Sequence, residues 1–173
     1  LLSLALAVPL SAASAAEGSG AKPDTAPHRI ALQMVGHHPR VQIQIEGVDR
    51  PLSFVVDTAA GATVIDATLA DATGMFDAPA GNVQFEVQGA GGSAGTVART
   101  GLRDLSAGNF RWKAQMLAMD LSRIARPGIT PVDGILGNDL MFRFDLRFDL
   151  AAGELLLAPP GSLPRSGCLD NAL

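Results

Sequence analysis

Residues 54–65 read FVVDTAAGATVI, a stretch that places Asp57 at the end of an apolar strand and before a run of small side chains. A carboxylate at the edge of a core can have its pKa shifted by desolvation and by a neighbouring carboxylate. The small side chains after Asp57 would let another backbone approach it closely. Taken alone, however, the stretch is more typical of an Asp that starts a turn or caps a short helix. The role of Asp57 therefore has to be inferred together with the segments on either side of this stretch.

Short strands are predicted on both sides of this stretch. Residues 40–46 alternate apolar and polar side chains, and with the apolar run 52–56 they predict a hairpin. Further strands are predicted at residues 82–88, 96–105, 110–119, 142–150 and 154–158. The glycine-rich residues 89–95 are predicted to form a mobile tip or a tight loop, and residues 134–137 (GILG) a buried apolar pair between glycines.

The strand predicted at residues 142–150 has an unbroken alternation. One face would carry Phe142, Phe144, Leu146, Phe148 and Leu150, and the other Arg143, Asp145, Arg147 and Asp149. The charged face is interpreted as solvated ion pairs rather than as a catalytic site.

Helix is predicted at only two places. Asp66 is expected to cap a short helix at residues 67–73 that Gly74 closes, and residues 138–142 are expected to form a helical turn. Because helix is so sparse, the sequence predicts an all-β fold, a closed barrel of short strands with one or two short helices.

Composition limits the classes of function. The chain has 173 residues, 47% of them apolar and 17% charged, which suits one folded domain. A formal charge of -4, one Trp and no Tyr argue against nucleic acid as a partner. The single Cys excludes an internal disulfide framework and a Cys-based zinc site, and the spacing of the other residues gives no other zinc-ligand pattern.

The N-terminal residues have the pattern of a targeting segment. An apolar run, LLSLALAVPL, precedes the small residues SAASAA, which predicts a signal peptide over residues 1–16 that lacks its natural start. The apolar run is too short to span a bilayer, so we expect export to the periplasm or secretion without a stable membrane anchor. The predicted domain order is then a linker at 17–28, a domain at 29–160 and a disordered tail at 161–173.

A second candidate for chemistry is Ser93, because GGSAG at residues 91–95 matches the nucleophile motif G-x-S-x-G. A nucleophile elbow needs a helix after the serine and a histidine later in the chain. Here the following residues are strand-like, and His28, His37 and His38 all precede Ser93. The match is therefore interpreted as a by-product of glycine richness.

Three segments in order resemble those of the retropepsin-like aspartic proteases, the single-lobe relatives of pepsin. FVVDTAAGATVI at 54–65 resembles the family's apolar-apolar-Asp-Thr/Ser-Gly-Ala loop, and VQGAGGSAG at 87–95 resembles its glycine-rich flap. DGILGNDLM at 133–141 resembles its apolar-apolar-Gly segment and the short helix that follows. The RFDLRFDL segment and its closing strand are similar to the tail of bacterial members, so the resemblance spans about residues 30–158.

The resemblance implies an aspartic endopeptidase that needs no cofactor and cuts extended polypeptide. It assigns catalysis to Asp57, with Thr58, Ala59 and Ala60 completing the loop. It assigns the substrate-covering flap to Gly89, Ala90, Gly91 and Gly92, and a structural crossing to Ile135, Leu136 and Gly137. The chain has one Asp-Thr loop, and Asp139 is not a second copy, so the site would require a homodimer in which each subunit donates Asp57.

One position departs from the family pattern. Ala59 stands where the family usually has Gly. If the backbone there required a positive φ, Ala would cost about 1–2 kcal/mol, and with a negative φ the methyl group would fit. The alternative function is therefore an inactive module of the same fold that binds peptides or partners.

Overall fold

The computed structural model describes residues 26–77, 85–89, 92–122 and 131–163. The predicted signal peptide, most of the predicted linker, Ala90, Gly91, and the residues from 164 onward, with Cys168 among them, lie outside the described residues. β1 begins at His28, one residue before the predicted start of the domain.

The described residues form ten strands and two short helices. The strands are β1 (His28–Val35), β2 (His38–Ile45), β3 (Leu52–Val56), β4 (Val64–Asp66), β5 (Phe85–Gly89), β6 (Gly92–Ala107), β7 (Phe110–Met119), β8 (Gly134–Leu136), β9 (Asp145–Asp149) and β10 (Glu154–Ala158). The helices are α1 (Ala67–Ala72) and α2 (Asn138–Met141).

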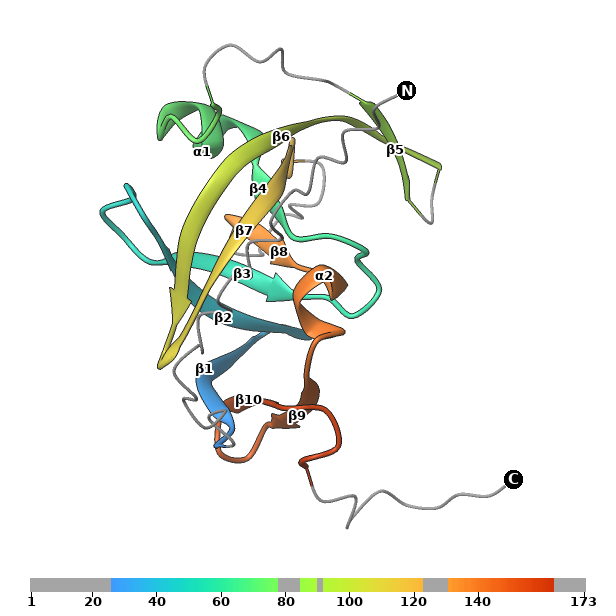
Figure 1. Cartoon of the computed structure of the whole chain (residues 1–173). Helices are drawn as coiled ribbons and strands as arrows, with labels where there is room; N and C mark the ends of the chain where they lie inside the picture. The colour runs from blue at the N-terminus through green and yellow to red at the C-terminus, as the bar shows by residue number, and fades with distance from the viewer. Residues whose placement is uncertain (1–25, 78–84, 90–91, 123–130, 164–173) are drawn as a thin grey trace, which may run out of the picture.

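Six of the strands close into a barrel. Their order is β6-β7-β4-β8-β3-β2, and a second pairing, between β2 and β6, closes the ring. β1, β10 and β9 extend the sheet from β2, and β5 extends it from β6, so β5 and β9 lie at opposite ends of the molecule (Figure 1). The prediction of an all-β closed barrel with one or two short helices is confirmed.

The barrel interior is filled by the apolar side chains of the predicted alternating strands. In β2, Val41, Ile43 and Ile45 are buried, whereas the intervening Gln42 and Gln44 are exposed. β2 pairs antiparallel with β3, as the predicted hairpin requires. Burial of this apolar surface, at roughly 25 cal/mol per Å², is the main stabilising term for such a fold.

The helix after β4 begins at the predicted residue and ends one residue before the predicted end. The Asp66 carboxylate accepts a hydrogen bond from the Leu69 amide at 3.1 Å, which caps α1. Gly74 follows α1 with φ of 62°, a left-handed conformation that glycine adopts at little cost.

The predicted strand over residues 142–150 is wrong at both ends, because β9 covers only Asp145–Asp149. The amides of Phe142, Arg143 and Phe144 still donate to carbonyls of α2, so these residues continue the helical turn. Phe142 is 85% exposed and Leu150, in the turn after β9, is 61% exposed, while the other predicted inward side chains pack against the core.

The predicted loop at residues 89–95 is also largely wrong. Gly92–Gly95 belong to β6, and Gly89 pairs with Gly92 across the hairpin. Ser93 pairs with Gln88 inside this ladder, and strand rather than helix follows it, so the nucleophile-elbow geometry is not formed. β6 continues from this hairpin into the barrel without a break. The glycine-rich residues at its start are therefore part of one long strand.

Asp145 and Asp149 differ in their contacts. Asp149 lies 3.6 Å from Arg147 in an exposed ion pair, as predicted. The Asp145 carboxylate instead accepts hydrogen bonds from the amides of Gly161 (2.7 Å) and Leu163 (3.4 Å), the first residues of the predicted tail. None of the described helices is long and apolar enough to cross a membrane.

Candidate active site

Asp57 lies immediately after β3 in a tight turn of small residues. Its amide donates to the Leu136 carbonyl at 3.1 Å, and its own carbonyl accepts from the Ala60 amide at 3.2 Å. The Ala59 amide donates to Asp57 Oδ1 at 2.8 Å, which orients the carboxylate. Asp57 is half-buried, whereas Thr58 and Ala59 are exposed. The turn therefore presents a backbone-fixed carboxylate at the surface end of a core strand.

The segment predicted as the crossing lies directly beside this turn. β3 and β8 pair in parallel, with Val55 opposite Ile135 and Val56 opposite Leu136. Leu136 and Gly137 are buried and Ile135 is half-buried. Because the ladder ends where the Asp57 amide bonds to Leu136, the position of Asp57 is set by β8 as well as by β3.

The first residue of α2 holds the rest of the turn. The Asn138 amide donates to the Ala60 carbonyl at 2.8 Å, and its side-chain Nδ2 donates to the Thr58 carbonyl. Two residues of the Asp57 turn are thus tied to α2 through their backbones. Asn138 lies in the quoted segment 133–141, but its contact with the turn joins segments about 80 residues apart and gave no signal in the sequence.

Gly137 is required by a close backbone approach. A Cβ at this position would lie 2.3 Å from the Ala62 carbonyl oxygen and 2.4 Å from its carbon. Its φ is −103°, which any residue can adopt, so the requirement is space and not backbone conformation. The predicted crossing is therefore a steric contact between two backbones.

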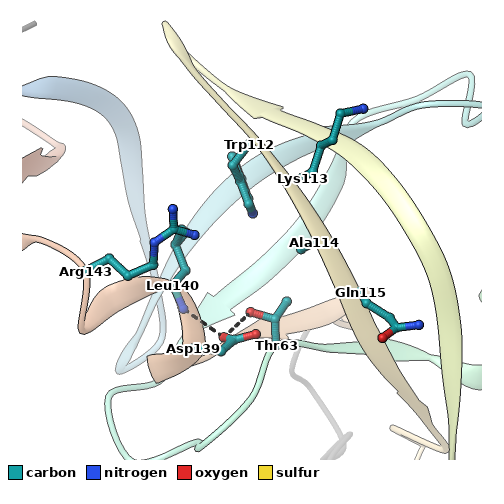
Figure 2. A pocket seen from close by; sticks show the side chains of 8 residues that line it. All are labelled: Thr63, Trp112, Lys113, Ala114, Gln115, Asp139, Leu140 and Arg143. Carbon is teal, nitrogen blue, oxygen red and sulfur yellow. Dashed lines mark hydrogen bonds between the residues drawn. The ribbon is translucent and has the colours of Figure 1, made fainter. Parts of the chain in front are cut away.

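Asp139, in α2, forms a hydrogen bond with Thr63, the last residue before β4. The buried Thr63 hydroxyl donates to Asp139 Oδ1 at 2.7 Å, and the Leu140 amide donates to the same oxygen at 3.0 Å (Figure 2). The Gly137 amide in turn donates to the Thr63 hydroxyl at 3.2 Å. Asp139 is thus a structural link, in agreement with its interpretation as something other than a second Asp-Thr loop.

A shallow pocket of about 110 Å³ opens beside this link. Its lining residues come from β7, from α2 and the turn after it, and from the segment before β4 (Figure 2): Thr63, Trp112, Lys113, Ala114, Gln115, Asp139, Leu140 and Arg143. Trp112 stacks on Phe110 with ring centroids 5.0 Å apart and packs against the core, as expected of a packing residue.

Ala59 is compatible with its backbone. No non-glycine residue in the described ranges has a positive φ, so Ala59 avoids the costly left-handed region. Its methyl group is also exposed. The departure from Gly therefore does not strain the turn in this subunit.

The predicted flap residues lie on a different part of the sheet. Gly89 ends β5 and Gly92 begins β6, while Ala90 and Gly91 lie outside the described residues. The β5–β6 hairpin lies on the same side of the molecule as the turn after β3 (Figure 1). The structure thus brings residues 57–60 and 135–137 into contact. The β5–β6 hairpin is not part of this contact.

Asp133 is a half-buried anchor that the sequence patterns did not single out. Its carboxylate accepts hydrogen bonds from both terminal nitrogens of Arg50, at 2.6 and 3.0 Å, and from the Ser53 amide at 2.7 Å. Burial acts to raise the pKa of Asp133 from 3.8, but the hydrogen bonds and the positive charges of Arg50 and Arg40 outweigh it and lower the pKa. Asp133 therefore holds the start of β3 beside β8.

Replacing Asp133 by Asn is expected to lower the free energy of unfolding by about 1–3 kcal/mol at neutral pH. Because the folded-state pKa is below the unfolded one, the carboxylate stabilises above the unfolded pKa, and this contribution is lost as pH falls through the folded pKa. Urea denaturation should show the gap between the two proteins shrinking from about pH 7 to pH 3. Asp49→Asn, an exposed neighbour, is the control, and a gap independent of pH would contradict the assignment.

Comparison with known proteins matches the chain to one protein family. A sequence model described as aspartyl protease matches residues 41–140. No curated protein is matched. Similar solved structures include a retropepsin-like aspartic protease from Rickettsia conorii, with 18% identity and a TM-score of 0.45 over 76% of this chain and 89% of the other.

Two further solved structures are similar. The EIAV protease in complex with the inhibitor HBY-793 is 20% identical with a TM-score of 0.43, over 64% of this chain and 90% of the other. The retroviral protease-like domain of Ddi1 from Leishmania major is 16% identical with a TM-score of 0.44, over 74% and 95%.

Proposed function

Because the chain belongs to the aspartyl protease family, whose sequence model covers residues 41–140, we propose that it is an aspartic endopeptidase and that Asp57 is its catalytic residue. The observation that carries the proposal is the Asp57 turn itself. It presents a half-buried carboxylate, oriented by the Ala59 amide, at the point where two core strands meet. Such a position combines access to substrate with a fixed geometry.

The proposed site is completed by a second subunit. One Asp57 per chain leaves a single carboxylate, whereas the reaction needs a base and an acid together. Two Asp57 side chains placed close together would share one proton, because like charges at that distance cannot both ionise. The pair would then titrate as one unit.

In the proposed reaction, the ionised Asp57 takes a proton from a water whose oxygen attacks the peptide carbonyl carbon. The protonated Asp57 of the other subunit donates to the carbonyl oxygen. The pair remains singly protonated in the resulting gem-diol adduct, with the roles of the two carboxyl groups exchanged. As the adduct collapses, the protonated Asp57 donates its proton to the leaving amine nitrogen and the C–N bond breaks. The other Asp57 takes a proton from one hydroxyl of the adduct, so the carboxylic acid product forms and the pair ends singly protonated. The glycine-rich β5–β6 hairpin is proposed to close over the extended substrate and exclude water.

A subunit-mixing experiment tests whether both carboxylates are needed. Unaltered chain and Asp57→Asn chain are mixed in equal amounts and allowed to exchange, and peptide cleavage is measured at constant total protein. If both subunits must supply Asp57, only about a quarter of the dimers are active. Sites that work independently would instead retain about half of the activity.

The outcomes separate the proposed enzyme from a binding module of the same fold. Activity near one quarter supports the shared site, and activity near one half rejects it. A protein that binds peptide but cleaves none, with or without Asp57, would favour the non-enzymatic alternative.

A further inference from the structure

A groove of about 360 Å³ opens on the barrel surface where β2 and β6 pair to close the ring. Its lining residues come from β2 and the turn after it, from β6 and from β7: Gln44, Glu46, Asp104, Leu105, Ser106 and Arg111. Small-ligand sites have volumes of about 300–1,000 Å³. The groove therefore has room for a small molecule, and its lining is polar except for Leu105.

One row of polar side chains crosses three strands in this groove. Gln44 pairs with Ser106, and Ser106 pairs with Arg111. The next row along the strands contains Ile45 and Leu105, which are buried in the core. Because side chains alternate between the two faces of a sheet, the row of Gln44, Ser106 and Arg111 faces outward.

A second outward row lies two positions further along the strands. The Glu46 amide donates to the Asp104 carbonyl at 2.9 Å, and Asp104 pairs with Lys113. The Lys113 ammonium lies 2.5 Å from the Asp104 carboxylate, so these two charges compensate each other. Within the described residues, the side chains of Glu46 and Arg111 form no ion pair or hydrogen bond. The groove therefore carries one uncompensated negative charge and one uncompensated positive charge.

These two uncompensated charges lie at opposite corners of the groove. Glu46 and Arg111 are separated by two strand spacings across the sheet and by two residues along it. With about 4.8 Å between strands and about 3.4 Å per residue, their backbone positions are about 12 Å apart. An extended tripeptide spans about 10 Å and an extended dipeptide only about 7 Å. The separation therefore matches the two ends of a tripeptide.

We propose that this groove binds short zwitterionic peptides, with the peptide ammonium at Glu46 and the peptide carboxylate at Arg111. Hydrogen bonds between oppositely charged groups are stronger than those between neutral groups, so the two ends fix the direction of the peptide. A single amino acid is too short to reach both charges, and an internal stretch of polypeptide has neither terminal charge. The groove therefore selects free peptides of about three residues.

The groove is separate from the Asp57 turn. On β2, Arg40 lies opposite Val55, two residues before Asp57, whereas the groove begins four residues further along β2, at Gln44. β6 runs from the β5–β6 hairpin to the turn that follows Ser106, so the hairpin and the groove lie towards opposite ends of this long strand (Figure 1). A peptide in the groove would therefore leave the proposed active site open.

Short peptides with two free ends are the chemical class that an endopeptidase releases. This link between the groove and the chain's own products rests on the proposed function. The binding itself does not, because it follows from the charges and spacing of the groove alone.

Titration of the full chain with trialanine, followed by heteronuclear NMR, tests the inference. Saturable shifts are expected at the amides of residues 44–46, 104–106 and 111. N-acetyl-trialanine and trialanine amide are each expected to bind about three- to tenfold more weakly, because each lacks one terminal charge. Dialanine is expected to bind more weakly than trialanine, because it cannot span both charges.

Two charge-neutralising variants assign the two ends of the peptide. Glu46→Gln should weaken trialanine binding about three- to tenfold, and acetylation of the peptide should then have no further effect, because its partner is already lost. Arg111→Gln should have the same relation to amidation of the carboxylate. Asp49→Asn and Arg143→Gln remove exposed charges outside the groove, and as controls they should leave trialanine binding unchanged.

The outcomes separate the groove from the proposed chemistry. Equal binding of free and blocked peptides would overturn the inference, as would shifts confined to residues 57–60 and the β5–β6 hairpin, or no saturable binding at millimolar trialanine. Groove binding by a chain that cleaves no peptide would support the groove and reject the chemistry. Asp57-dependent cleavage without groove binding would reject the groove and support the chemistry.

Discussion

Replacing Asp57 by Asn is expected to lower kcat for peptide cleavage by about 10³-fold or more, with a smaller effect on KM. Asn is nearly isosteric, and its amide oxygen can still accept the Ala59 amide that now bonds to Asp57 Oδ1. The turn and its bonds to Leu136 and Asn138 involve backbone groups of residues 57–60 and should persist. The substitution therefore removes the proton chemistry and leaves the binding surface in place.

The measurement is single-substrate cleavage kinetics on purified protein, together with the melting temperature of each variant. Asp71→Asn, an exposed carboxylate on α1, is the matched control and should keep full activity. Equal residual activity in the Asp57→Asn and unaltered proteins would remove Asp57 from the catalytic role. Activity abolished by Ser93→Ala instead would point to a serine nucleophile, despite the strand that surrounds Ser93.

Gly137→Ala is expected to destabilise the fold by about 2–3 kcal/mol. The added methyl group would meet the Ala62 carbonyl at 2.3 Å and the Thr63 amide nitrogen at 2.9 Å. These are backbone atoms, so they cannot rotate away as a flexible side chain would. Relief requires the turn and α2 to separate, which would weaken the Thr63–Asp139 bond and shift the turn that carries Asp57.

Gly61→Ala is the matched control in the same turn. Gly61 is exposed, no atom lies within 4 Å of the place that an added methyl group would take, and its φ is not in the left-handed region. Urea denaturation should therefore show a change of less than about 0.5 kcal/mol. A similar loss of stability at both positions would mean that the turn tolerates no side chain generally, and not that Gly137 marks a specific backbone contact.

Local patterns predicted the elements that depend on local physics. The alternation at residues 40–46, the apolar run at 52–56 and the Asp66 cap each record a strand or helix end within a few residues, and each is found. The same alternation misled at residues 142–150. There the amides of Phe142, Arg143 and Phe144 donate to carbonyls of α2. An amide that makes such a helical hydrogen bond is not available for strand pairing.

The candidate site was predictable only in its parts. The segments 54–65 and 133–141 were both recognised, and the structure brings them together through β3 and β8. The groups that hold them together were not recognised, because Asn138, Thr63 and Asp133 are ordinary polar residues until they meet a partner about 75–80 residues away. Periodicity carries no information about such pairs.

The sequence by itself determined an all-β chain, its short strands and the placing of Asp57 at the end of one of them, because side-chain period and turn residues act over a few positions. Only the tertiary structure decided that β2 and β6 close the barrel and that Gly137 must be small. It also decided that Ala59 is unstrained and that β9 is left at an open end of the sheet. These features depend on which distant backbones lie side by side, and that follows from the packing of the whole chain.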